Sequence, residues 1–543
     1  MIFKANIRPL FVFAVLLVVA SVLNPAQAQR KSRKSQVVDT VTIPGLQRTI
    51  EVMNLISSEY VTEPNTDKLS ETAIRAMLTS LDPHSIYIPA KDVQRSNEAL
   101  QGNFDGVGIS FTIFNDTICV NEVIAGGPSE KVGLLSGDKI LYIDGIQCTG
   151  DSAKQAFVFR HLRGKKGTTV VVDVLRGKEK LNFHITRDKI PIHSIEVYFM
   201  EDDSIGYVSL LRFARSSVEE FRTAMRELKK QGMKSLILDL RGNSGGFLDI
   251  ACGLANEFIG RGRLLVYQEG RNVPRQNFKS NFYGTFREGD LVVLVDENSA
   301  SASEIVSGAI QDWDRGTLIG RRTFGKGLVQ RMFPLADGGQ VRITTARYFT
   351  PSGRCIQRPY DKGTADYNNE YSKRYKSGEL FCMDSIHLPD SLKYKTASGR
   401  TVYGGGGIIP DKFIPIDTTP ASKFYQECRR KGLLNQFPQY YVDRHRNDTL
   451  ISDFEHYLAN YDKLGLDTLF CAFAAEKGVN KDSIQESQSD SIVTFNEHFL
   501  SLQIKALVAD KLFGRGHYYR IMKDEDRFYQ AAVAHLRNKE GKE

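Results

Sequence analysis

The sequence has little of what metal, disulfide and redox sites require. Its 543 residues include seven cysteines, an odd number scattered along the chain and never spaced as CxxC. This pattern fits neither a disulfide framework nor a zinc site. Cys355 and Cys382 are one pair that stays open as a candidate disulfide. We therefore expect neither a disulfide framework nor a zinc site. We also expect no cofactor.

A sustained basic stripe is also absent. The net charge of +8 is small for 543 residues, and basic patches such as Arg429-Arg430-Lys431 are short. No nucleic-acid-binding motif occurs, so we expect no nucleic-acid partner. An apolar content of 41% and a charged content of 25% are ordinary for globular proteins. The length predicts several domains.

The apolar run near the N-terminus is short for a membrane span. Lys4 and Arg8 precede the run Leu10–Leu23, and Ala26-Gln27-Ala28 supplies a small-x-small pattern. Together these are typical of a signal peptide cleaved after Ala28. We expect export, in a bacterium to the periplasm or cell envelope. If the segment were uncleaved, it would instead anchor the protein to the membrane.

A serine-rich turn between a predicted strand and a predicted helix is the best candidate for chemistry. Leu291–Val295 reads as a buried strand, and Ile305–Trp313 has helical spacing. Between them lies Ser299-Ala300-Ser301-Ala302-Ser303-Glu304. A serine at such a junction can point outward, and the free amides at a helix N-terminus favour negative charge. An acyl-transfer nucleophile needs this geometry.

Histidine, the usual base for a serine, is absent between His193 and His387. The candidate base is Lys326, within Thr323-Phe324-Gly325-Lys326-Gly327. A lysine has an ordinary pKa near ~10.4, and burial can lower it by roughly 3–5 units. Gln330 lies four positions on, which places it on the same face as Lys326. A neutral amide can orient the amine without raising its pKa.

A second turn follows the predicted buried strand Ser235–Leu240. Its sequence is Arg241-Gly242-Asn243-Ser244-Gly245-Gly246, and a helix is expected from Phe247. No Lys-Ser/Thr pair follows, so a phosphate-binding P-loop is disfavoured. The amide of Gly245 or Gly246, together with that of Ala302, could form an oxyanion hole. A purely structural turn stays open.

Residues 102–188 read as a small β-rich domain. Gly106-Val107-Gly108-Ile109 leads into an alternating strand, and the stretch Leu134–Gly145 fits Leu-x-x-Gly-Asp-x-Ile-Leu-x-Ile-Asp-Gly. A helix is expected over Asp151–Leu162, followed by two strands. This order resembles a PDZ domain.

The motifs taken together resemble the carboxy-terminal processing peptidases, also called tail-specific proteases. The resemblance implies an exported serine endopeptidase that acts on proteins or peptides with exposed C-termini. It implies Ser301 as nucleophile, Lys326 as general base and Gln330 as the residue that orients the lysine. Asp312 is expected to be a helix-surface residue or a structural hydrogen-bond partner. His84, in Asp82-Pro83-His84-Ser85, is expected to be structural because Asp-Pro turns end helices.

The PDZ resemblance has its own implications. The C-terminus of a peptide would add to the domain as a strand, with its carboxylate on the amides of Gly106, Val107, Gly108 and Ile109. Arg176 would either help to read the peptide or simply flank a β-turn. We expect peptide binding at this domain to increase turnover.

The predicted fold class is α+β, with several domains. We expect a signal peptide at 1–28, N-terminal helices at 29–101 (polar and basic at 29–40), the PDZ domain at 102–188, the protease core at 189–417 and a helical region at 418–543. By resemblance, the core is a crotonase-like spiral of ββα units. Within it, residues 361–395 are expected to be a polar inserted loop.

Alternatives remain for function and for the C-terminal helices. A non-catalytic PDZ adaptor that binds the C-terminal tails of envelope proteins is the second hypothesis, and the intact serine, lysine and glutamine argue against it. An acyl-CoA enzyme is disfavoured by export. The C-terminal helices could mediate homo-oligomer formation or partner docking, or could cap the protease core.

Overall fold

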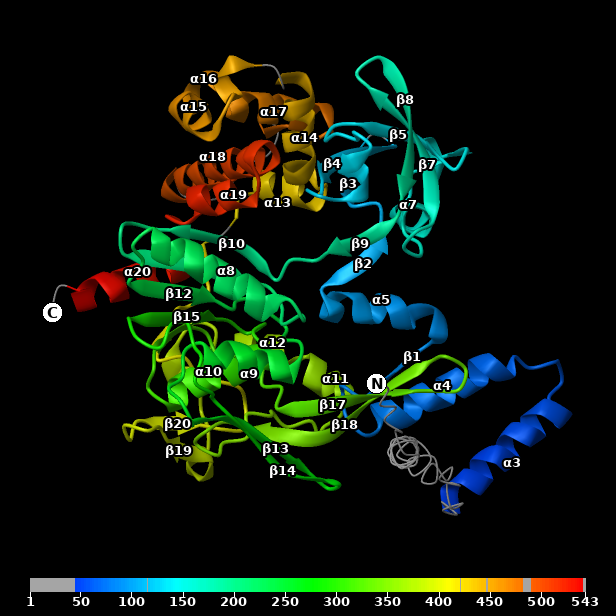
Figure 1. Cartoon of the computed structure of the whole chain (residues 1–543), viewed down its shortest axis with the longest axis vertical. Helices are drawn as coiled ribbons and strands as arrows, with labels where there is room; N and C mark the ends of the chain where they lie inside the picture. Colours follow the sequence, from blue (N-terminus) through cyan, green and yellow to red (C-terminus); the bar gives the residue numbers. More distant parts are fainter. Residues whose placement is uncertain (1–43, 115, 420, 446–447, 482–489, 541–543) are drawn as a thin grey trace, which may run out of the picture. The chain divides into compact units, whose positions relative to one another are not determined.

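The computed structural model describes residues 44–114, 116–419, 421–445, 448–481 and 490–540 (Figure 1). The predicted signal peptide and the polar start at 29–40 lie outside these residues. The chain divides into two units, residues 1–75 and 76–543, each of which is described by itself. The first unit contains α3 (Pro44–Glu59), and α4 (Thr66–Thr79) begins in it. Both helices were predicted.

The β-rich domain is built on one antiparallel sheet with the strand order β3-β4-β5-β7-β8, and β6 pairs with β5. A separate ribbon of β2 and β9 lies at the two ends of the domain. The predicted helix Asp151–Leu162 begins later, because residues 150–152 form a 3₁₀ turn. The elements are β2 (Asn103–Gly106), β3 (Ile109–Phe114), β4 (Thr117–Val123), α6 (Pro128–Lys131), β5 (Lys139–Ile143), β6 (Ile146–Gln147), α7 (Gln155–Leu162), β7 (Thr169–Arg176), β8 (Glu179–Thr186) and β9 (Asp188–Pro191).

The main sheet of the following region has the order β10-β11-β12-β15-β16-β21. All its pairings are parallel except that of β10 with β11. Fully buried strands such as Leu291–Val295 are expected where helices cover the sheet. Its elements are β10 (Ile195–Met200), β11 (Ile205–Leu210), α8 (Ser217–Lys230), β12 (Ser235–Asp239), α9 (Leu248–Asn256), β15 (Leu291–Val295), α10 (Ala302–Asp312), β16 (Thr317–Gly320) and β21 (Lys412–Phe413).

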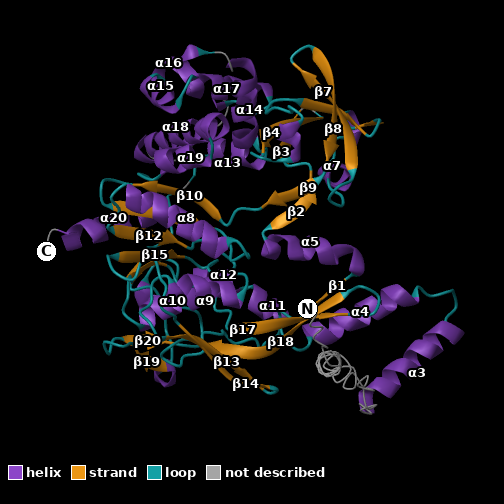
Figure 2. Ribbon diagram, viewed as in Figure 1, coloured by secondary structure: helices purple, strands orange, loops and turns teal. Residues whose placement is uncertain are grey.

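A second sheet lies beside the helices α9 and α10 (Figure 2). Its order is β1-β18-β13-β14, and β17 also pairs with β18. The predicted polar loop 361–395 contains two short helices, so that prediction was incomplete. The remaining elements of this region are β1 (Ile86–Ile88), α5 (Ala90–Gln101), β13 (Leu264–Gly270), β14 (Val273–Lys279), β17 (Leu328–Pro334), β18 (Gln340–Phe349), α11 (Thr364–Asn368), α12 (Glu370–Lys376), β19 (Lys393–Lys395) and β20 (Thr401–Tyr403).

The C-terminal region is helical, as predicted. Most of its helices share one apolar core, while the last helix packs instead on the main sheet against residues such as Tyr207 and Ile237. The predicted α+β class is confirmed. The helices are α13 (Lys423–Arg430), α14 (Leu433–His445), α15 (Phe454–Ala459), α16 (Tyr461–Leu464), α17 (Leu466–Glu476), α18 (Asp490–Phe513), α19 (Arg515–Met522) and α20 (Arg527–Glu540).

Candidate active site

Ser301 sits at the turn between β15 and α10 in a backbone conformation that non-glycine residues rarely adopt. Its φ is 55° and its ψ is −108°. Such a conformation costs on the order of 1–3 kcal/mol and persists only where the surroundings enforce it. The side chain of Ser301 and that of Glu304 form a capping box at the start of α10. The turn is therefore held in place from within the helix that follows it.

Glu304 joins the serine turn to the lysine segment. Its fully buried carboxylate accepts hydrogen bonds from the backbone amides of Ser301 (2.8 Å) and Lys326 (2.9 Å). The amide of Gly325 (2.7 Å) and the hydroxyl of Thr323 (2.5 Å) also donate to it. Burial raises the pKa of Glu304, and these four donors oppose that shift. One side chain thus fixes the backbone on both sides of the site.

Lys326 is half-buried just before β17. Its Nζ lies 3.1 Å from the Oε1 of Gln330, and the Nε2 of Gln330 donates to the backbone carbonyl of His84. Burial lowers the pKa of Lys326, while the charges of Asp82 and Glu304 oppose this. A lowered pKa increases the fraction of neutral amine, the form that can accept a proton.

His84 contributes its backbone to the site. Burial and the nearby charge of Lys326 lower the pKa of His84 to about 4, and its Nε2 lies 2.9 Å from the hydroxyl of Tyr367. The Asp82 carboxylate caps the turn by accepting from the amides of His84 and Ser85 (both 2.8 Å). The expected structural turn is therefore present, and its carbonyl also orients Gln330.

The glycine turn after β12 lies against the serine turn. A methyl group placed on Gly245 would stand 3.0 Å from the amide nitrogen of Ala302, so glycine is needed there for close approach. The amide of Gly245 donates to the side chain of Asn243 (2.9 Å). Within the described residues, the amides of Gly246 and Ala302 have no such partner. The sequence left open whether the amide of Gly245 or that of Gly246 could serve in an oxyanion hole. The Gly245 amide is already used by Asn243, which favours the Gly246 amide as the candidate.

A cavity of about 260 Å³ brings these groups together. Tyr348 and Arg342 of β18 also line it. The residues predicted for catalysis and for the oxyanion hole all line this cavity: Ser301, Lys326, Gln330, Gly245, Gly246 and Ala302.

Sequence reasoning missed two residues that hold the site. Glu304 is the last residue of the serine-rich turn, and no role was predicted for it. The Ser-x-x-Glu spacing of Ser301 and Glu304, which is that of a capping box, could have indicated one. The buried Tyr348 places its hydroxyl 3.0 Å from the carbonyl of Ser301 and 2.6 Å from that of Lys326. No local pattern indicates this contact, because β18 reaches the site only through sheet pairing.

Asp312 is a structural partner. Its buried carboxylate lies 2.7 Å from the guanidinium of the buried Arg354. It does not line the cavity that contains Ser301. Of the two roles expected from sequence, the hydrogen-bond partner is confirmed, and the helix-surface position is wrong.

The predicted PDZ residues separate into two places. Gly106, Val107 and Gly108 form the end of β2 and the loop before β3, which begins at Ile109. Arg176 ends β7, where its guanidinium donates to Asp138 (2.7 Å) and to the carbonyl of Gly133 (2.8 Å). This ion pair holds Arg176 within the domain.

The described residues contain no group of three or more His, Cys, Asp or Glu side chains that could hold a metal ion. Cys355 and Cys382 are both free thiols, so this candidate pair is not formed. None of the helices described for this chain is both long enough and apolar enough to cross a bilayer.

Comparison with known proteins identifies the family of this chain. The model described as Peptidase family S41 matches residues 204–365, and the PDZ domain model matches residues 106–186. A carboxy-terminal-processing protease of Bartonella bacilliformis is 35% identical over 403 residues, which are 73% of this chain and 91% of that protein. The chain belongs to peptidase family S41. The resemblance inferred from the motifs is therefore confirmed.

Two further relatives and two further family models are similar to parts of the chain. A probable CtpA-like serine protease of Staphylococcus aureus is 33% identical over 307 residues, 56% of this chain and 61% of that protein. The solved structure of a photosystem II D1 C-terminal processing protease is 28% identical, covering 56% of this chain and 88% of that one, with a TM-score of 0.32. A CtpB N-terminal domain model matches residues 12–92, and a family of unknown function matches 424–514. This S41 peptidase thus combines a PDZ domain and a protease core with a helical region of unassigned role.

Proposed function

We propose that this S41 protease is an exported endopeptidase with a Ser301/Lys326 dyad. The observation that carries the proposal is the shared cavity. It contains a strained serine at a helix N-terminus and a lysine whose pKa is lowered by burial and whose amine contacts a neutral amide. Export rests on the N-terminal segment and favours the periplasm or cell envelope.

The reaction would proceed by acyl transfer. The neutral Nζ of Lys326 takes the hydroxyl proton of Ser301 as the oxygen attacks the substrate carbonyl, and it then gives that proton to the leaving amine. Water, deprotonated by the same amine, hydrolyses the acyl-enzyme. Gln330 is a positioning residue, since it acts by holding the amine.

The oxyanion would lie between the amides of Gly246 and Ala302. Both N–H groups lack a partner within the described residues, and Ala302 begins α10, where the helix dipole favours negative charge. Gly245 instead permits the two turns to approach each other. Removing one oxyanion donor typically costs roughly 100- to 1,000-fold in rate.

Substrate selection would come from the PDZ domain. The β3 strand forms one edge of its sheet, and the Gly106–Ile109 loop precedes that strand. An extended C-terminal peptide can pair with such an edge and place its carboxylate on the loop amides. Proteins with exposed C-termini are therefore the proposed substrates. Homo-oligomer formation through the C-terminal helices stays a hypothesis, tested by solution mass after truncation near Thr419.

The test is cleavage of an unstructured polypeptide by the full chain. Ser301→Ala and Lys326→Ala should each lower the rate by about 10⁴-fold or more, by analogy with removal of other serine-protease nucleophiles and bases. Ser398→Ala and Lys362→Ala, at exposed positions, should leave it unchanged. Binding without cleavage by the wild type would instead support the PDZ adaptor.

A further inference from the structure

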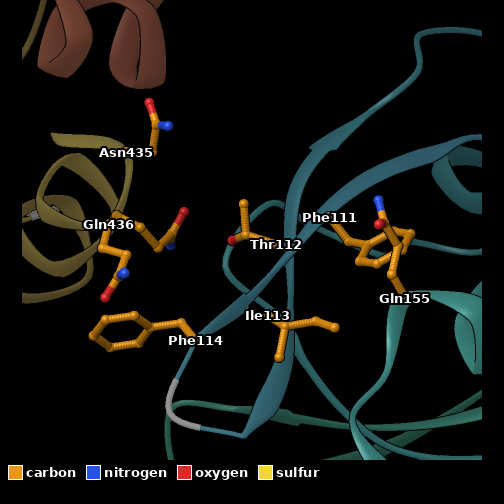
Figure 3. Close-up of a pocket in the computed structure, with 8 residues that line it drawn as sticks. Phe111, Thr112, Ile113, Phe114, Gln155, Asn435 and Gln436 are labelled. Carbon is orange, nitrogen blue, oxygen red and sulfur yellow. The ribbon is translucent and has the colours of Figure 1, made fainter. Parts of the chain in front are cut away.

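A cavity of about 350 Å³ lies between the PDZ domain and the C-terminal helical region (Figure 3). The PDZ side is formed by residues of β3 and by Gln155 at the start of α7, and the opposite side by Asn435, Gln436 and Gln439 of α14. Neither the protease chemistry nor the PDZ fold by itself accounts for the α14 side of this cavity.

The cavity follows the free edge of β3. That strand pairs with β4 on one side, and no other strand of the described chain pairs with its second edge. Figure 3 shows Phe111 beside Gln155 on one side of β3, whereas Thr112 and Phe114 point to the side of Asn435 and Gln436. A strand added to this edge would therefore lie between α7 and α14.

Helix α14 is placed there by packing of the two regions. Phe114 packs against the apolar core of the C-terminal helices, and the Nζ of Lys477 lies 5.6 Å from its ring centroid. Burial raises the pKa of Cys119 on β4 to about 11; the charge of Asp443 on α14 also raises it, and that of Lys511 on α18 lowers it. The helical region is thus docked on the β3–β4 hairpin beside the cavity.

The amide side chains on α14 retain hydrogen-bonding capacity. The buried Gln439 uses its Nε2 on Asp443 (2.7 Å), and Gln436 uses its Nε2 on the carbonyl of Lys431 (3.1 Å). Each amide oxygen is left as an acceptor. Positions 435 and 439 are one helical turn apart, so Asn435 and Gln439 share a face. This wall therefore suits a side chain that donates hydrogen bonds.

Strand geometry identifies which part of a peptide would reach α14. In antiparallel pairing, a peptide whose last residue lies opposite Ile109 places its fourth residue from the C-terminus opposite Thr112. Directly opposed residues project to the same face of the sheet. Since Thr112 faces α14, that fourth side chain would also face α14.

We propose that α14 forms a second wall of the PDZ peptide groove and selects a hydroxyl or amide side chain at the fourth residue from the substrate's C-terminus. The inference rests on the proposed function for its peptide ligand. It assigns to the helical region of unknown function a direct part in substrate recognition.

The test is binding of fluorescent hexapeptides to the full chain carrying Ser301→Ala, which prevents turnover. The peptides end in leucine and differ only at the fourth residue from the end, which is glutamine or alanine. We expect the glutamine peptide to bind about 3- to 10-fold more tightly, the range of one or two added hydrogen bonds. The triple substitution N435A/Q436A/Q439A, which removes all three amides that line the cavity, should abolish that difference, and Q426A, an exposed amide on α13, should preserve it.

A variant that gains binding to one peptide excludes misfolding as the cause of changed binding, and Gln436→Glu is designed for this purpose. Gln436→Glu should bind a peptide with lysine at the fourth position at least about threefold more tightly than the parent does. It should bind a peptide with glutamate at that position more weakly than the parent does. Equal binding of the glutamine and alanine peptides by the parent, or a preference that survives N435A/Q436A/Q439A, would overturn the role of α14 and leave the PDZ ligand intact. If no peptide bound, the PDZ part of the proposed function would fail as well, whereas cleavage by Ser301 would be judged separately.

Discussion

The Nζ of Lys326 lies 3.1 Å from the Oε1 of Gln330. The Nε2 of Gln330 donates to the carbonyl of His84, which determines the orientation of the amide. If the amide were reversed, two oxygens would face each other and its NH₂ would face the amine. The lysine therefore contacts a neutral acceptor, whose orientation is fixed by a turn far away in sequence.

Gln330→Glu should move the pH profile of kcat/KM to higher pH. A carboxylate beside Lys326 favours the charged amine and raises its pKa, so less neutral base is present at pH 7. We expect at least a tenfold loss at pH 7 that is partly recovered at pH 9 to 10. Gln330→Ala should lower the rate without this alkaline shift. Parallel profiles for Gln330→Glu and the wild type would contradict the role of the neutral amide.

Lys326→Met should abolish cleavage and stabilise the fold. Burial lowers the pKa of Lys326 in the folded protein, so the unfolded chain binds more protons between that lowered pKa and the ordinary value of 10.5. Wild-type stability therefore rises with pH across this window. At pH 7 the free energy of unfolding of the methionine variant, measured by urea unfolding, should exceed that of the wild type by ~0.5–2 kcal/mol. This difference should shrink as the pH approaches 10.5. An equal or lower stability at pH 7 would count against a destabilising buried amine.

Glu304→Gln should damage both stability and rate. One carboxylate oxygen becomes an NH₂ group that faces N–H donors, although the size of the side chain is kept. We expect a loss of about 1–3 kcal/mol in the free energy of unfolding and at least a tenfold fall in kcat/KM. Glu455→Gln, at an exposed position on α15, is the matched control. Urea unfolding and peptide hydrolysis check the two effects. Wild-type values for both would contradict the conclusion that the Glu304 carboxylate holds the serine and lysine segments in place.

Asp312→Ala should destabilise the protein without a direct effect on catalysis. It leaves the fully buried guanidinium of Arg354 without its carboxylate, which typically costs about 3–5 kcal/mol. The folded fraction should keep kcat/KM within about threefold of wild type. Replacing both partners, Asp312→Leu with Arg354→Met, should recover part of the stability. A rate loss far beyond the loss of folded protein would indicate a catalytic role for Asp312.

Tyr529→Ala should destabilise the protease core itself. Tyr529 of α20 is buried against Tyr207 at a ring separation of 5.3 Å, and its hydroxyl donates to Glu201 (2.7 Å). Truncating a large buried aromatic side chain costs about 3–5 kcal/mol. Denaturant unfolding, measured together with the mass in solution, distinguishes a cap over the protease core from self-association of the C-terminal helices. Lower stability at unchanged mass supports a cap, and a change of mass alone supports self-association.

The candidate catalytic residues could be named from the sequence because the signals that mark them are local. The apolar run Leu291–Val295, the small residues around Ser301 and the glycines flanking Lys326 are each readable within one short segment. The PDZ strands and the helical C-terminal region were likewise visible from periodicity, since alternation and 3.6-residue spacing are properties of single elements.

Only the tertiary structure decided how these segments meet. The roles of Glu304, Tyr348 and the His84 carbonyl arise from contacts across different turns and sheets, which no local pattern encodes. The proposal of Gly246 rather than Gly245 as oxyanion donor rests on the hydrogen bond from the Gly245 amide to Asn243. The placement of α14 beside β3 depends on packing between distant segments. Residue type and spacing determine which groups can react or bind, whereas hydrogen bonds and packing across the chain determine which of them are left free to do so.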